Sequence, residues 1–141
     1  IVKTSLKMVE ESLLGLTLAY PETRMSLEDL TEASFSVPET KGIFVAVRDA
    51  KAKATLADIA LGLPELADYA KILALQGEEQ FGSVGPADRG VETFTLARRL
   101  QKLSGNKSKE LLTTQIQAAE ASGDTLLARS LLEQYQALIK E

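Results

Sequence analysis

The sequence predicts an all-α fold, in which a bundle of about six helices is followed by an antiparallel helical hairpin. Apolar residues recur at helical spacing through most of the 141-residue chain. Aromatic residues make up only 5% of it, so leucine and alanine supply the apolar surface, which favours helices over sheets. The last 35 residues contain two amphipathic segments on either side of Ser122-Gly123-Asp124. We therefore expect a bundle subdomain at residues 1–105 and a hairpin at residues 106–141.

The first helix is expected at residues 5–19, where apolar residues including Leu13 and Leu16 repeat at helical spacing. Pro21 should end it, because the residue before a proline disfavours the α region. Ser26 is then expected to cap a short helix at residues 26–30.

Pro38 predicts the start of a third helix that runs to about Lys51, since proline is favoured in the first helical turn. Residues 42–47, GIFVAV, are β-prone, but their position inside this helical pattern favours a helix with Phe44 facing inward. Thr55 is expected to cap a short helix that Gly62 ends.

Pro64 predicts a longer helix that ends at Gly77, and four apolar residues are expected to face inward from it: Leu66, Tyr69, Ile72 and Leu73. Residues 77–90 contain four of the nine glycines and are predicted to form a long loop. A helix at residues 91–103 follows. The next three residues, Ser104-Gly105-Asn106, either break the chain's path or are a tolerated dip within one long helix.

The hairpin has the turn chemistry that a tight helix reversal requires. Gly123 should end the first helix by adopting a positive φ, and Asp124 should cap the free N–H groups of the second. A seam is expected between Ala128, Leu131, Tyr135 and Leu138 of the second helix and Leu112, Ile116 and Ala119 of the first. Leu127, Leu132 and Ile139 widen the apolar arc, and this extra surface either packs on the bundle or anchors a partner.

Composition excludes several functional classes. The chain has no cysteine and no histidine, which removes disulfides, thiol nucleophiles, imidazole bases and the usual ligands of structural zinc. The absence of cysteine fits a cytoplasmic location, and no apolar run is long enough to cross a membrane. A net charge of −4 argues against bulk electrostatic binding of nucleic acid. We interpret the basic segment as a solvated helix face; it comprises Arg98, Arg99, Lys102, Lys107 and Lys109.

Two patterns that sometimes carry chemistry are interpreted as structural. The acidic pairs Glu10-Glu11, Glu28-Asp29 and Glu78-Glu79 resemble magnesium or acid–base pairs, but neighbouring residues on a helix point to different faces. A solvated surface is the favoured interpretation of all three pairs. The glycines at 82, 85 and 90 lack the Lys-Ser/Thr of a phosphate loop, since Val91-Glu92 follows them.

Three segments, in this order, resemble the C-terminal helicase-binding domain of bacterial DNA primase, the DnaG family. They are VEESLLGLTLAYPE (residues 9–22), FSVPETKGIFVAV (residues 35–47) and LLTTQIQAAEASGDTLLARSLLEQYQALIKE (residues 111–141). The resemblance implies a helical bundle followed by a two-helix hairpin. It also implies a non-catalytic segment, because the nucleotidyltransferase activity and its zinc and magnesium belong to other domains of such primases. No cofactor is therefore expected here.

The resemblance further implies a partner. In this family the hairpin binds the N-terminal domain of the DnaB-type replicative helicase and so recruits primase to the replication fork. From apolar excess and this analogy, we expect Leu127, Leu131, Tyr135, Leu138 and Ile139 to contact the helicase, with Arg129 at the rim of the contact. Direct nucleic-acid contact is not expected, and the chain should be a monomer or a weak or swapped dimer.

Two other functions stay open from the sequence. The N-terminal collar domain of a replicative helicase has a similar bundle and also ends in a helical hairpin, and residues 9–47 alone fit it as well. Such a domain would self-associate. A small helical enzyme of unknown type is the third hypothesis, although no nucleophile–base pair in it could involve histidine or cysteine.

Overall fold

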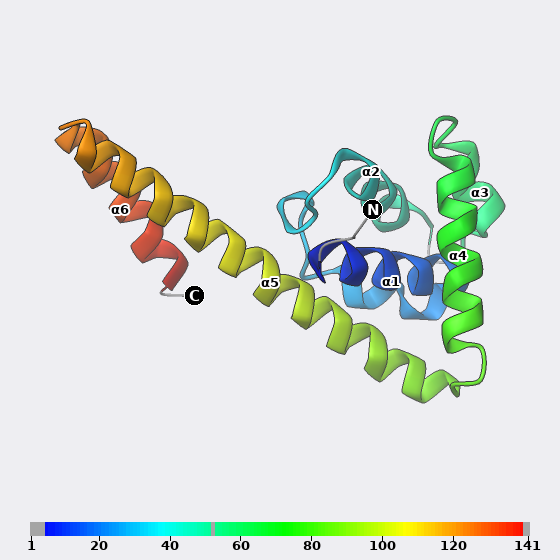
Figure 1. Ribbon diagram of the computed structural model, residues 1–141. Helices are drawn as coiled ribbons and strands as arrows, with labels where there is room; N and C mark the ends of the chain where they lie inside the picture. The colour runs from blue at the N-terminus through cyan, green and yellow to red at the C-terminus, as the bar shows by residue number, and fades with distance from the viewer. Residues whose placement is uncertain (1–4, 52, 140–141) are drawn as a thin grey trace. The chain divides into compact units, whose positions relative to one another are not determined.

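The computed structural model describes residues 5–51 and 53–139, and every regular element in these ranges is a helix (Figure 1). The all-α prediction is therefore confirmed. The chain falls into two compact units, residues 1–101 (unit 1) and residues 102–141 (unit 2). The division lies within α5 (Pro86–Ala121). Because α5 is one continuous helix, Ser104-Gly105-Asn106 interrupts its apolar pattern without breaking the helix.

Helix α1 (Ser5–Ala19) is the centre of unit 1. Leu13, Leu14, Leu16 and Leu18 are all buried, and because they occupy nearly consecutive positions, α1 is enclosed on several sides. It packs against α4 (Ala67–Phe81), α2 (Pro38–Asp49) and the 3₁₀ helix η1 (Pro21–Leu27), as Figure 1 shows for α4 and α2. The single apolar stripe expected from the sequence is the innermost part of a helix that is covered almost all round.

The predicted helix at residues 26–30 is wrong. Pro21 starts η1 at once, and the buried Ser26 hydroxyl donates to the carbonyl of Thr23 at 2.8 Å instead of capping a new helix. A second 3₁₀ turn, η2 (Glu32–Ser34), leads to Phe35, whose ring stacks on Phe44 with the ring centroids 4.6 Å apart. This aromatic pair fastens the irregular segment to α2.

Helices α2 and α3 form as the sequence predicts. Pro38 opens α2, Phe44 is buried in it, and the helix ends at Asp49, two residues before the expected end. The Thr55 side chain caps α3 (Leu56–Leu61) by accepting from the Asp58 N–H, and the Asp58 carboxylate accepts from the Thr55 N–H in return. That backbone hydrogen bond lowers the pKa of Asp58.

Gly77 does not end α4, which continues to Phe81. A Cβ atom at Gly77 would lie 2.5 Å from the carbonyl oxygen of Gly15, and a Cβ at Gly15 would collide with the carbonyl of Leu73. The two glycines therefore allow the backbones of α1 and α4 to touch where the helices cross. Helix α4 begins at Ala67, three residues after Pro64, and Ile72 points outward with 52% of its surface exposed. The prediction for Leu73 is confirmed, Leu66 and Tyr69 are partly buried, and Ala70 and Ala74 also face inward.

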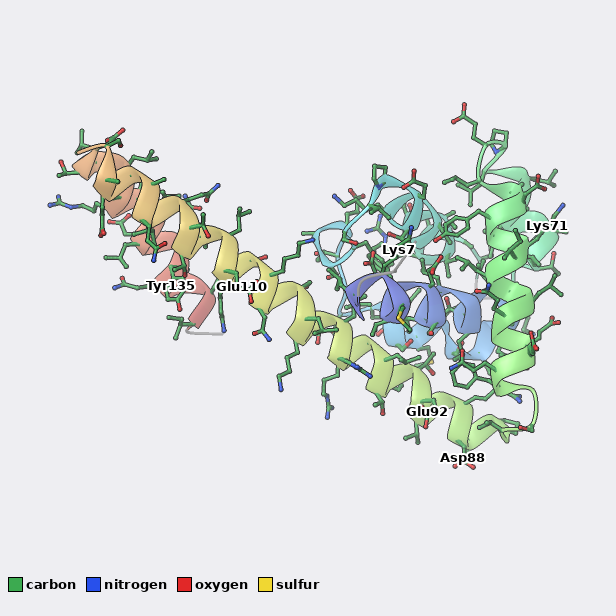
Figure 2. The ribbon with its side chains drawn as sticks, viewed as in Figure 1. Lys7, Lys71, Asp88, Glu92, Glu110 and Tyr135 are labelled. Carbon is green, nitrogen blue, oxygen red and sulfur yellow. The ribbon has the colours of Figure 1, made fainter. Side chains whose placement is uncertain are left out.

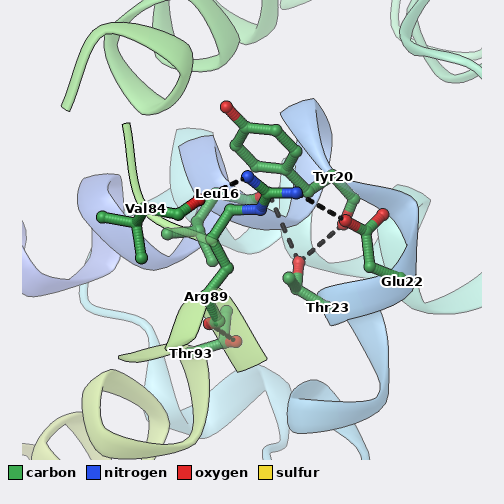
Figure 3. Close-up of polar contacts among 7 residues, drawn as sticks. All are labelled: Leu16, Tyr20, Glu22, Thr23, Val84, Arg89 and Thr93. Atoms are coloured by element: carbon green, nitrogen blue, oxygen red, sulfur yellow. Dashed lines mark hydrogen bonds and ion pairs between the residues drawn. The ribbon is translucent and has the colours of Figure 1, made fainter. Parts of the chain in front are cut away.

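The predicted long loop at residues 77–90 is only the four residues 82–85, because α4 ends late and α5 begins at Pro86. Figure 3 shows how the first turn of α5 is held. Arg89 donates to the carbonyl of Val84 at 2.7 Å, lies 4.1 Å from the Tyr20 ring centroid and reaches Glu22 at 3.5 Å. Further along α5, Thr93, Ala97 and Leu100 are buried, whereas Phe94 is 54% exposed.

Candidate interaction surface on the helical hairpin

The hairpin of unit 2 comprises the α5 residues from Lys102 to Ala121, the turn at residues 122–124 and α6 (Thr125–Ile139). Gly123 has φ 78°, the left-handed conformation expected of it. The N–H of Asp124 donates to the carbonyl of Ala119 at 2.9 Å, and the Asp124 carboxylate accepts from the N–H of Leu127 at 3.0 Å. The predicted turn chemistry is thus confirmed at both helix ends.

A seam of apolar residues holds the two hairpin helices together. Ala119 on α5 and Leu131 on α6 are its buried members, with 3% and 8% of their surfaces exposed. The remaining residues expected in the seam are all partly buried: Leu112, Ile116, Ala128, Tyr135 and Leu138. In Figure 2, the labelled residues Tyr135 and Glu110 mark α6 and α5, the two helices of the hairpin.

Some of the residues expected to contact a partner lie in this seam, and the others are exposed to solvent. Leu131 is buried, and Tyr135 and Leu138 are partly buried, so these three serve the hairpin's own packing. Leu127 and Ile139 are 48% and 56% exposed, and Arg129 is exposed. The structure adds three exposed leucines that the contact prediction omitted: Leu111, Leu126 and Leu132.

Three exposed apolar residues of α6 flank the seam, whereas Leu126 faces away from it. At about 100° per residue, Leu127 lies on one side of Leu131, and Leu132 and Ile139 lie on the other. A hairpin needs only the central stripe to hold two helices together. The flanking leucines and isoleucine are therefore apolar surface beyond what the pairing of the helices uses.

On the Leu127 side, the hairpin contains a groove of about 330 Å³ between the end of α5 and the start of α6. Six residues line it: Gln115, Ala118, Ala119, Ser122, Leu127 and Leu131. Beside the closed Ala119–Leu131 seam, the lining residues of α5 are short or polar, which leaves the groove open to solvent.

Unit 1 contains a buried carboxylate pair, which corrects the interpretation of Glu10-Glu11 as solvated. Glu10 is fully buried. Its carboxylate accepts from the N–H of Ser36 at 2.8 Å, from the Ser36 hydroxyl at 2.6 Å and from the Thr40 hydroxyl at 2.7 Å.

Glu11 is 8% exposed and accepts from the Tyr69 hydroxyl at 2.7 Å. Burial and this hydrogen bond raise the pKa of Tyr69. These carboxylates link α1 to α2 and α4, and their partners are protein donors. Glu28-Asp29 and Glu78-Glu79 are exposed, as expected.

A larger hollow of about 660 Å³ lies in unit 1 beside the end of α2 and α3. Its charged lining residues are Asp49, Lys51, Lys53 and Asp58, whose formal charges cancel. Among the described residues, no group of three or more carboxylates is placed to hold a metal ion. In the same ranges, none of the helices has both the length and the apolar character needed to cross a membrane.

No match to this chain was found among protein families, curated proteins or solved structures.

Proposed function

We propose that this chain is a non-catalytic interaction domain of a bacterial DNA primase, whose hairpin binds the N-terminal domain of the DnaB-type replicative helicase. Its role is to recruit primase to the replication fork for RNA primer synthesis. The resemblance in residues 9–22, 35–47 and 111–141 supports this function, and so does a helical bundle followed by a hairpin.

The observation that carries the proposal is the exposed apolar surface on both sides of the hairpin seam. Leu127, Leu132 and Ile139 are each about half exposed although the hairpin is fully formed. Single exposed apolar residues are common on proteins, but these three lie beside one seam on a two-helix element, Leu127 on one side and Leu132 with Ile139 on the other, and each side suits packing against another helix.

The size of the effect follows from the exposed fractions. Full burial of a leucine or isoleucine is worth about 1.5–3 kcal/mol, so burying the exposed half of each contributes about 1 kcal/mol. Leu132 and Ile139, which lie on the same side of the seam, together contribute about 2 kcal/mol, or more than a tenfold gain in affinity, and Leu127 contributes about 1 kcal/mol to a contact on the other side. A ring-shaped helicase that presents several copies of its N-terminal domain would raise the apparent affinity further.

The roles of the individual residues follow from their burial. Leu127, Leu132 and Ile139 contact the helicase, and Arg129 lies at the rim of the contact. Leu131, Tyr135 and Leu138 act mainly by keeping the two helices paired, because they occupy the seam. Their replacement would weaken binding only by weakening the hairpin.

The test is titration calorimetry of the chain against the N-terminal domain of the helicase from the same bacterium. We expect saturable binding that Leu132→Asp and Ile139→Asp weaken by tenfold or more, while far-ultraviolet circular dichroism stays helical. Leu75→Asp is the matched control, because Leu75 is similarly exposed, at 64%, but lies on α4 of unit 1. Absence of binding, together with self-assembly in sedimentation, would instead support a helicase collar domain.

A further inference from the structure

The outward side of α4 carries a stripe of apolar and acidic residues, which we call the α4 stripe. At about 100° per residue its four members fall within about 60° of one another, opposite the buried side of the helix: Asp68, Ile72, Leu75 and Glu79. All four are exposed, and Ile72 and Leu75 are each more than half exposed. Lys71, labelled in Figure 2, lies about 70° to the side of the stripe. The α4 stripe is thus an apolar pair with a carboxylate at each end.

The first turns of α5 carry a stripe of opposite charge, which we call the α5 stripe. Val91, Phe94 and Arg98 are exposed and also fall within about 60° of one another. Residues 93–109 contain five basic residues and no acidic one. The two acidic residues that Figure 2 labels near the start of α5 lie about 90° or more from the stripe. The α5 stripe is therefore an apolar pair followed by a cation.

The spacing of the two stripes matches. The apolar residues are three positions apart in both, as Ile72 and Leu75 on α4 and as Val91 and Phe94 on α5. Arg98 follows its apolar pair by four positions, and a carboxylate lies four positions from the apolar pair of α4 in either direction. When the apolar pairs face each other, Arg98 therefore meets Glu79 if the helices run parallel.

The antiparallel arrangement satisfies the same charges. With α4 reversed, Leu75 faces Val91, Ile72 faces Phe94 and Arg98 meets Asp68. Both stripes belong to unit 1 and are exposed to solvent, so neither covers the other within one chain. A second copy of the chain supplies the missing half of each.

From this complementarity we infer that the α5 stripe of one copy of this chain docks on the α4 stripe of a second copy. The two stripes are different surfaces, so the contact is head-to-tail. Four apolar residues and one ion pair make a contact smaller than a stable interface, and the association is therefore weak and depends on concentration. The inference goes beyond the proposed function, because both stripes lie in unit 1 whereas the helicase contact is assigned to the hairpin.

Sedimentation equilibrium of the whole chain tests the contact, at concentrations from about 10 μM to about 1 mM. The weight-average mass should rise above that of one chain as the concentration rises, and added salt should reduce the rise because an ion pair contributes. Arg98→Glu should weaken the association about tenfold. Lys107→Glu is the matched control, since it changes the charge equally but lies on the opposite side of α5.

Leu75→Asp tests the apolar half of the contact and should also weaken the association about tenfold or more. Leu126→Asp is its matched control, because Leu126 is exposed but lies on α6. All four changed residues are exposed, so circular dichroism should stay helical.

A charge swap identifies the two surfaces. Asp68→Arg or Glu79→Arg, combined with Arg98→Glu in the same chain, should restore the association to within about threefold of the wild type. Rescue by Asp68→Arg means that the helices run antiparallel, and rescue by Glu79→Arg means that they run parallel. Rescue by neither overturns the pairing of the two stripes.

The remaining outcomes decide between the two proposals. A wild-type mass that stays at one chain up to about 1 mM overturns this inference, as does an association that Arg98→Glu and Leu75→Asp leave unchanged. Arg98→Glu should leave the affinity for the helicase N-terminal domain within about twofold. A chain that associates through the stripes but does not bind the helicase supports this inference and overturns only the proposed function.

Discussion

Replacing Gly77 with alanine is expected to destabilise unit 1, although alanine is the better helix former. Gly77 lies in the interior of α4, and its backbone faces Gly15 of α1. An added Cβ would be 2.5 Å from the Gly15 oxygen, 2.6 Å from its carbonyl carbon and 3.0 Å from the nitrogen of Leu16. All three are backbone atoms, so no side-chain rotation relieves the collision and the two helices must separate.

The magnitude follows from two opposing effects. Glycine to alanine inside a helix gains about 1 kcal/mol of intrinsic stability. The new Cβ falls about 0.9 Å short of the 3.4 Å at which ordinary contacts begin. Overpacking of this kind costs about 1–3 kcal/mol, and a contact between two backbones lies at the upper end because neither helix yields locally. We expect a net loss of about 2 kcal/mol.

Urea denaturation followed by circular dichroism measures this loss. With a denaturant slope of about 2 kcal/mol per molar urea, the midpoint should fall by about 1 M. Gly90→Ala is the matched control, because Gly90 lies in α5 with nothing within 4 Å of its added Cβ. It should raise the midpoint. A rise of similar size in Gly77→Ala would refute the close approach of α1 and α4.

Three more predictions concern buried and partly buried polar groups of unit 1. Glu10→Ala should lower the free energy of unfolding by about 3 kcal/mol, because hydrogen bonds to a buried charged group are lost; a loss under about 1 kcal/mol in urea curves would mean a solvated carboxylate. Tyr69 should ionise above its ordinary pKa of about 10, so the stability that it contributes is complete below about pH 10 and is lost as the pH rises further. Phenolate absorbance compared between the wild type and Tyr69→Phe measures this, and a difference curve centred at or below pH 10 contradicts it. Arg89→Met should cost about 1–3 kcal/mol in thermal unfolding, whereas Arg98→Met, at an exposed site, should be nearly neutral; equal effects would remove the proposed role of Arg89 at the start of α5.

The hairpin was predictable because its determinants are local. Gly123 and Asp124 are adjacent in the chain, and the conformations that they favour do not depend on distant residues. The seam between Ala119 and Leu131 also follows from helical periodicity once the turn is placed. The same reasoning correctly expected apolar excess at Leu127 and Ile139.

The groove was not predictable, because it depends on which residues face each other across the hairpin. Ala118 and Ala119 appear in the sequence as ordinary helix formers. Only their placement opposite Leu127 and Leu131 gives an open groove between the two helices. Whether Leu131 belongs to the seam or to a contact surface is likewise decided by the rotation of α6 about its own axis.

Helical periodicity and capping are properties of neighbouring residues, so they were enough to predict that this protein is helical, where most of its helices begin and how its hairpin turns. The roles of Gly77 and Glu10 follow only from contacts made in the folded chain. A glycine in the sequence of a helix usually indicates its end. Gly77 instead lies where α4 crosses α1, against the backbone of Gly15, which is more than 60 residues away in the chain. A glutamate in a helix is usually solvated. Glu10 is buried instead, and hydrogen bonds from the hydroxyls of Ser36 and Thr40 offset the cost of removing its carboxylate from water. In both cases the deciding contact joins distant segments, and local pattern carries no information about which segments meet.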